Sequence, residues 1–117
     1  MPTKRVILEM GTGNDLHGGD YTKAAMRAVA DALHHSSLPL IRTLKLDAER
    51  MQVEVTIGVQ RPEKVDAGAV KSALPHGEVT VKIVKGGLDV PDNETGDIAV
   101  IASAAVCVRM ALPQVRQ

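Results

Sequence analysis

Residues 97–110 constrain the fold more than any other part of the chain, because they form an apolar run in which both faces of a strand would be apolar. Side chains alternate between the two faces of a strand. One face would carry Ile98, Val100, Ala102 and Val106, and the other Ala99, Ile101, Ala105 and Cys107. Such a strand must be covered on both faces, so the run predicts a sheet with a layer packed on each side.

Apolar periodicity predicts the remaining elements. The stripe formed by Ala25, Val29, Ala32 and Leu33 predicts a helix from Asp20 or Thr22, either of which could cap it, to about His35. A second, shorter helix is expected at residues 66–74. Strands are expected at residues 5–10, 40–47, 51–59, 78–85 and 97–110, with a glycine-rich loop at residues 11–18 and a polar loop at residues 88–96.

The order βαββαββ predicts an α+β two-layer sandwich, a single domain over residues 1–117, with about five strands in a mixed or antiparallel sheet and two helices on one face. The connection between residues 47 and 51 is too short for a parallel crossover, which argues against a doubly wound nucleotide fold. Two helices can cover only one face of the sheet. The second apolar face therefore predicts a homo-oligomer, trimer or larger included, in which sheet faces or edges meet. The alternative is a twisted sheet whose central strand is simply apolar on both faces.

Composition narrows the function classes. Lys plus Arg and Asp plus Glu each number 14, and the single aromatic residue is Tyr21, so neither a basic field nor a base-stacking platform indicates nucleic acid. The longest apolar stretch is too short and too rich in alanine to span a membrane. The lone Cys107 excludes an intrachain disulfide framework, and no secretory signal pattern is present, so we expect a cytoplasmic protein.

The candidate site is the segment of residues 11–18, Gly-Thr-Gly-Asn-Asp-Leu-His-Gly. Asp15 and His17 place a carboxylate and an imidazole two positions apart, which is compatible with two chemistries. With Glu9, Asp20 or a histidine of a neighbouring subunit they could hold a divalent metal such as Zn²⁺ or Mn²⁺. Alternatively, Asp15 could orient His17 for acid–base catalysis, or burial could activate Glu9 at the end of its strand.

The glycines of this segment allow a third chemistry. Gly11, Gly13 and Gly18 could present backbone N–H groups to a small polar or anionic ligand, with Lys23 in the first helical turn adding charge and Tyr21 reaching back over the loop. A purely local turn, in which the glycines only permit the bend, remains the alternative. The spacing does not match a dinucleotide or phosphate-loop motif, because position 16 is Leu16.

The same segment resembles the N-terminal signature G-x-G-x-D-x-H-G of a conserved hypothetical family found in bacteria and plants. The fixed positions are matched by Gly11, Gly13, Asp15, His17 and Gly18. Residues 20–25 and 32–37 also resemble that family, and the likeness covers essentially the whole chain. The family has no established activity, so the resemblance favours a functional segment over a local turn without implying a reaction.

The element order also resembles the chorismate-mutase-like sandwich, whose assemblies commonly place sites between subunits. No residue is carried over from that analogy. Whether Ser103, Lys82, Cys107 or Arg109 join a site is not decided by the sequence.

Two hypotheses follow. The first is a small homo-oligomeric enzyme, a hydrolase or lyase of a small polar metabolite that uses His17 and Asp15. The second is a non-catalytic scaffold that binds a ligand or a metal.

Overall fold

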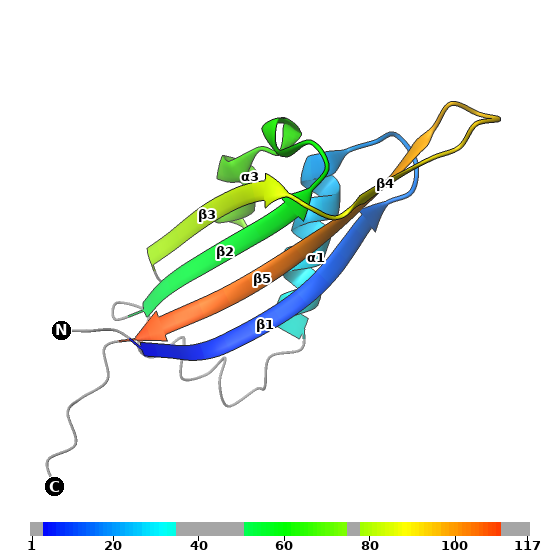
Figure 1. The fold of residues 1–117 in the computed structure, drawn as a ribbon. Coiled ribbons are helices and arrows are strands. Elements are labelled where there is room, and N and C mark those ends of the chain that lie inside the picture. The colour runs from blue at the N-terminus through cyan, green and yellow to red at the C-terminus, as the bar shows by residue number, and fades with distance from the viewer. Residues whose placement is uncertain (1–3, 35–50, 75–77, 111–117) are drawn as a thin grey trace, which may run out of the picture.

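The computed structural model describes residues 4–34, 51–74 and 78–110 (Figure 1). These residues form β1 (Lys4–Asp15), α1 (Tyr21–His34), β2 (Met51–Val59), the short 3-10 helix η2 (Pro62–Lys64), α3 (Ala67–Ser72), β3 (Glu78–Lys85), β4 (Leu88–Pro91) and β5 (Ile98–Met110). The predicted α+β class, with a five-stranded mixed sheet and two helices, is confirmed. The strand expected at residues 40–47 lies outside the described residues.

The sheet has the order β1-β5-β2-β3, with β4 paired to β5. β5 is antiparallel to β1 and to β2, whereas β2 and β3 are parallel and are connected through η2 and α3. On the side of β5 that β1 does not occupy, β2 pairs with residues 103–110 and β4 pairs with residues 98–101. The prediction of a loop at residues 88–96 is therefore wrong for residues 88–91. These residues form β4, which pairs with the part of β5 that β2 does not reach.

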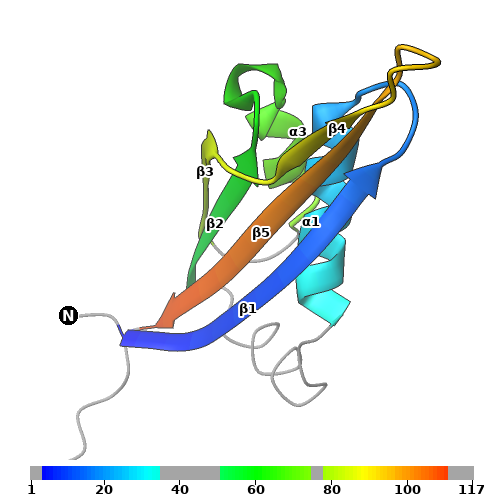
Figure 2. The ribbon, with the colours of Figure 1, turned by 45° about the vertical axis from the view of Figure 1, so that its right-hand side comes forward.

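Buried and more exposed side chains alternate along the central strands, so the sheet has one buried face. Val53, Val55, Ile57 and Val59 of β2 are all buried there, as are the even-numbered residues of β5 from Val100 to Val108. The helix α1 packs its own buried side chains against this face: Tyr21, Ala24, Ala25, Ala28, Val29 and Ala32. Both helices lie on this one side of the sheet, as Figures 1 and 2 show for α1 and α3. The expectation that the helices cover a single face is thus confirmed.

Both helices begin at a capping aspartate. Asp20 accepts a hydrogen bond from the backbone N–H of Lys23 at 3.0 Å, which decides between the two caps expected for α1. Asp66 accepts one from Ala69 at 3.1 Å and caps α3. No helix within the described ranges is long and apolar enough to cross a membrane.

Candidate functional site

The glycine-rich segment is not a loop over its first half. β1 continues to Asp15, and Gly11 and Gly13 lie in the strand, buried beneath α1 and in register with Ala104 and Ala102 of β5. A Cβ atom on Gly11 would stand 2.4 Å from the backbone nitrogen of Ala32. The loop expectation is therefore wrong for residues 11–15, because small size here serves close packing of a helix on a strand.

The turn proper begins after Asp15 and is fixed by carboxylates. Asp15 is only 5% exposed, and its Oδ2 accepts the backbone N–H of Asp20 at 2.9 Å. Its Oδ1 lies 3.7 Å from the guanidinium of Arg27. Gly18 and Gly19 both have positive φ, which a residue with a side chain rarely adopts, and they permit the bend between Asp15 and α1. Asp15 thus holds the turn in place.

His17 is paired with a different carboxylate from the one expected. Its Nδ1 lies 3.0 Å from Oδ2 of Asp97, while Oδ1 of Asp97 accepts the backbone N–H of Gly18 at 3.0 Å. The hydrogen bond from Gly18, followed by that from His17, lowers the pKa of Asp97. The expectation that Asp15 orients His17 is wrong, because Asp15 is buried against Asp20 and Arg27.

The ionised state of Asp97 fixes the tautomer of the imidazole. A carboxylate can only accept hydrogen bonds, so the His17 Nδ1 must carry the proton that is shared with Asp97. In the neutral ring, Nε2 then holds the lone pair. The side chain of His17 is 87% exposed, so this nitrogen can be reached from solvent.

A hollow of about 580 Å³ lies beside this pair. It is lined by Leu16 and His17, by Val90 and Pro91 of β4, by residues 92–95 of the following turn, and by Asp97 and Ala99. The carboxylates of Asp92, Glu94 and Asp97 line this His17 hollow, and no lysine or arginine among the described residues does. Backbone N–H groups of Glu94 and Thr95 lower the pKa of Asp92, so both aspartates remain negative at neutral pH.

Tyr21 points to β4 and not back over the glycine-rich segment. Its hydroxyl donates a hydrogen bond to Oδ2 of Asp89 at 2.5 Å, and burial, followed by this hydrogen bond, raises the pKa of Tyr21. Oδ1 of Asp89 is buried and has no hydrogen-bond partner among the described residues. The ammonium of Lys64 lies 6.0 Å from the centre of the Tyr21 ring.

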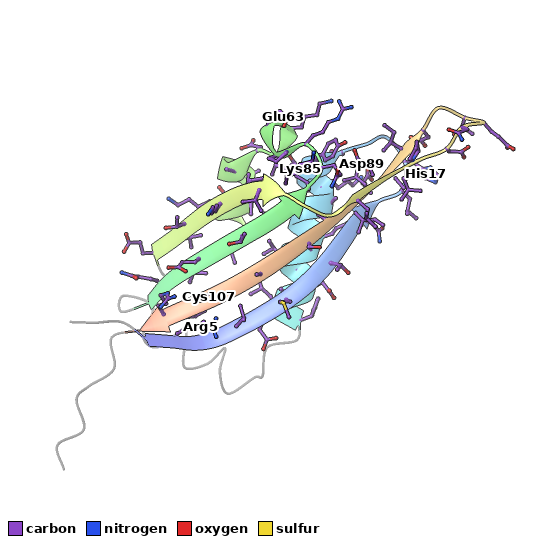
Figure 3. The ribbon with its side chains drawn as sticks, in the orientation of Figure 1. Arg5, His17, Glu63, Lys85, Asp89 and Cys107 are labelled. Atoms are coloured by element: carbon purple, nitrogen blue, oxygen red, sulfur yellow. The ribbon has the colours of Figure 1, made fainter. Side chains whose placement is uncertain are left out.

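The hairpin of β4 and β5 is therefore held at two points, one in the turn after β1 and one at the first residue of α1. Asp97 binds His17 and Gly18, and Asp89 binds Tyr21. In Figure 3 His17 lies at this end of the sheet, whereas Arg5 and Cys107 lie at the opposite end. Asp97 was missed by sequence reasoning, since it is 80 positions from His17 and appeared only as the first residue of a strand.

The remaining candidates are not drawn into this site. Glu9 lies within β1, opposite Val106 in register, and not at the end of its strand. Lys23 is exposed in the first turn of α1.

Further candidates lie on the sheet face that the helices leave open. Ser103 and Cys107 are on this face of β5, and Lys82 is on it in β3. Arg109 pairs there with Glu54 of β2 at 3.3 Å.

The expected metal ligands are separated by their partners. Asp15 bonds to Asp20 and His17 to Asp97. Within the described parts of the chain, no group of three or more His, Cys, Asp or Glu side chains could hold a metal ion. The described residues therefore offer no ligand set for the Zn²⁺ or Mn²⁺ site expected at Asp15 and His17.

The family model of the conserved hypothetical protein family Lin0512_fam matches residues 5–108, nearly the whole chain. The chain belongs to this family. It is also similar to a solved structure, that of an FtsZ-like protein of unknown function from Nostoc punctiforme. The two chains share 38% sequence identity and a TM-score of 0.81, over 96% of this chain and 99% of the other. No curated protein matches the chain. Membership in Lin0512_fam shows which proteins this chain is related to but implies no activity, so any chemistry must be inferred from the site itself.

Proposed function

We propose that this protein is a small enzyme that binds a small polar metabolite in the His17 hollow and acts on it by acid–base chemistry, as a hydrolase or lyase. The observation that carries the proposal is the pairing of an exposed imidazole with an ionised carboxylate, His17 with Asp97, at the rim of a hollow of about 580 Å³. A histidine held in this way is a common general base.

Each member of the pair has a distinct role. Nε2 of His17 accepts a proton from water or from the substrate, and the resulting imidazolium returns it to the leaving group. Asp97 acts as a positioning residue, because it holds Nδ1 in the protonated tautomer and balances the positive charge that develops on the ring. Its second oxygen is occupied by the N–H of Gly18, which fixes the carboxylate relative to the turn.

The charge of the hollow favours neutral or cationic substrates. Of the residues that the structure describes, three carboxylates and no Lys or Arg side chain line it, so an anionic ligand would be repelled. This differs from the anionic ligand considered on the sequence. The exposed apolar side chains of Leu16 and Val90 in the same lining suit the carbon skeleton of a small polar molecule.

The test is substrate consumption, followed by NMR, with a panel of neutral and cationic cyclic amides, esters and β-substituted amines. The wild-type protein is compared with His17→Asn, which keeps a side-chain donor for Asp97 but has no titratable base. The exposed His34 at the end of α1 provides a matched control, His34→Asn. We expect consumption to fall roughly 100-fold or more in His17→Asn and to be unchanged in His34→Asn. Equal consumption by wild type and His17→Asn would contradict the proposal.

A non-catalytic binding protein is the second candidate, and the 87% exposure of the His17 side chain favours it, since catalytic groups usually work in sites shielded from water. In that case a panel compound would bind without being consumed. His17→Asn would then weaken binding, which ligand-observed NMR detects in the same samples.

A further inference from the structure

The face of the sheet opposite the helices carries a concentration of exposed apolar side chains. Six large hydrophobic residues are exposed within the described parts of the chain. Four of them lie on this open face: Leu8 and Met10 of β1, and Leu88 and Val90 of β4. Met10 is 69% exposed. Neither α1 nor α3 lies over this face, which is turned toward the viewer in Figure 1.

The edge of the sheet, by contrast, is closed to pairing where β1 runs beside α1. The backbone N–H of Thr12, on the free edge of β1, donates to Oδ2 of Asp31 at 2.9 Å. Two residues on, the carbonyl of Asn14 accepts a hydrogen bond from Arg27 at 2.7 Å. Capping of edge groups by side chains is a usual protection against strand addition. At this part of β1 the capped groups therefore oppose pairing with another strand, whereas the open face has no such protection.

Met10, the most exposed large apolar side chain among the described residues, stands at the rim of a hollow in the open face. A hollow of about 480 Å³ lies beside Met10, and small side chains line it on this face: Thr12, Thr56, Gly58, Ser103 and Ala105. Met10 itself lines this hollow, so a two-fold axis through it would bring the Met10 side chains of the two copies together. Such self-complementary contacts are typical of isologous dimers. We propose that a second copy of this chain packs on the open face, sheet against sheet.

The available area is adequate for a stable dimer. Strands are spaced by about 4.8 Å and rise about 3.3 Å per residue, so four strands of about nine residues present a face on the order of 600 Å² in projection. The corrugated accessible surface is larger than this projection. A standard interface buries about 800 Å² per partner. An interface of standard size would therefore cover most of the open face.

Two of the charged side chains on this face already form an ion pair. The apolar residues of this face lie on β1, β4 and β5, whereas Glu54 and Lys82 lie on β2 and β3. Arg109 pairs with Glu54 at 3.3 Å, so these two opposite charges would enter the interface as a pair. Val90 also lines the His17 hollow, but the inference makes no use of the pairing of His17 with Asp97.

The test measures mass by light scattering and sedimentation at micromolar concentration. We expect the wild-type chain to show twice its monomer mass of 12.4 kDa. Met10→Glu should raise the dimer dissociation constant by roughly 100-fold or more, because two unpaired carboxylates would be buried around the axis. Met26→Glu is the matched control, since Met26 is 38% exposed on α1, and it should leave the mass unchanged. Far-UV circular dichroism checks that each variant is folded.

Two further measurements identify the face. An equimolar mixture of Met10→Glu and Met10→Lys should recover the dimer, because opposite charges then meet across the axis. Cys107, half-buried on the open face next to Leu8, should react more slowly with a thiol reagent in the wild type than in Met10→Glu. A wild-type monomer throughout the micromolar range would overturn the proposal. So would a dimer that survives Met10→Glu, or an assembly of larger mass in which Met10→Glu has no effect.

Discussion

Gly13 of β1 and Ala28 of α1 lie so close that a Cβ atom added to the glycine would stand 2.2 Å from the backbone nitrogen of the alanine. Gly11 and Ala32 are related in the same way, at 2.4 Å. Alternate positions of a strand face one side, and positions four apart on a helix lie one above the other. The contact between β1 and α1 is therefore made backbone against backbone at two successive points.

Substitution at this contact should be strongly destabilising. Because the atoms that Gly13→Ala would strike belong to the backbone, neither element can yield without moving the helix from the sheet. We expect a loss of at least about 3 kcal/mol in the free energy of unfolding, measured by urea denaturation. Thr12→Ala, at the neighbouring exposed position, should change it by less than about 0.5 kcal/mol. A Gly13→Ala variant as stable as Thr12→Ala would show that the contact is looser than described.

The sequence predicted the elements whose signals are local and periodic. The stripe of α1 and the alternation of β2 each repeat over several turns or residue pairs, and both elements are found as expected. The glycine-rich segment was predicted as a loop because glycine is typical of turns. In the structure Gly11 and Gly13 lie in a strand, where a residue with a side chain would collide with the backbone of α1. Only the position of α1 in space shows which reason applies.

Of the His17–Asp97 pair, the sequence analysis predicted only the histidine. His17 was identified from its neighbours in the sequence, but Asp97 was not, because nothing local marks which of several aspartates in residues 89–97 will meet it. Asp15 was expected beside His17 on spacing alone. In a strand followed by a turn, that spacing directs Asp15 into the buried face and leaves His17 exposed.

Tyr21 provides a direct optical test of its surroundings, because it is the only tyrosine and the chain has no tryptophan. Burial, followed by the hydrogen bond to Asp89, raises its pKa, so the tyrosinate absorbance of the native protein should appear with a midpoint above 10.0 and return to about 10.0 in urea. A folded pKa above the unfolded value means that this contribution to stability is complete below pH 10 and is lost as the pH rises through the folded pKa. Asp89→Asn should lower the native midpoint without abolishing the shift, since burial remains. A native midpoint at 10.0 would refute the described environment.

Acid titration should report on Asp97. Its pKa is lowered by the N–H of Gly18 and by His17, so its contribution to stability is present above the usual value of 3.8 and is lost as the pH falls through the lower folded pKa. The amide resonance of Gly18, followed by NMR, should shift with a midpoint below 3.8. His17→Asn should keep most of that shift, because Gly18 is the larger cause, whereas Asp97→Asn should remove the transition. An unchanged Gly18 transition in Asp97→Asn would assign it to another group.

The capped edge of β1 can be tested by hydrogen exchange. Thr12 donates its backbone N–H to Asp31, on the side of β1 away from β5, so Asp31→Ala should expose this amide to solvent and speed its exchange. A single hydrogen bond to a charged group contributes about 1.5–3 kcal/mol, which corresponds to an increase of roughly ten-fold or more where the amide exchanges by local opening. Arg27→Ala is the control, because Arg27 binds the carbonyl of Asn14 and not the Thr12 amide. Since the uncapped edge can then accept another strand, Asp31→Ala should also aggregate faster than the wild type near the melting temperature. Equal Thr12 exchange in the two variants would mean that the carboxylate does not protect the edge.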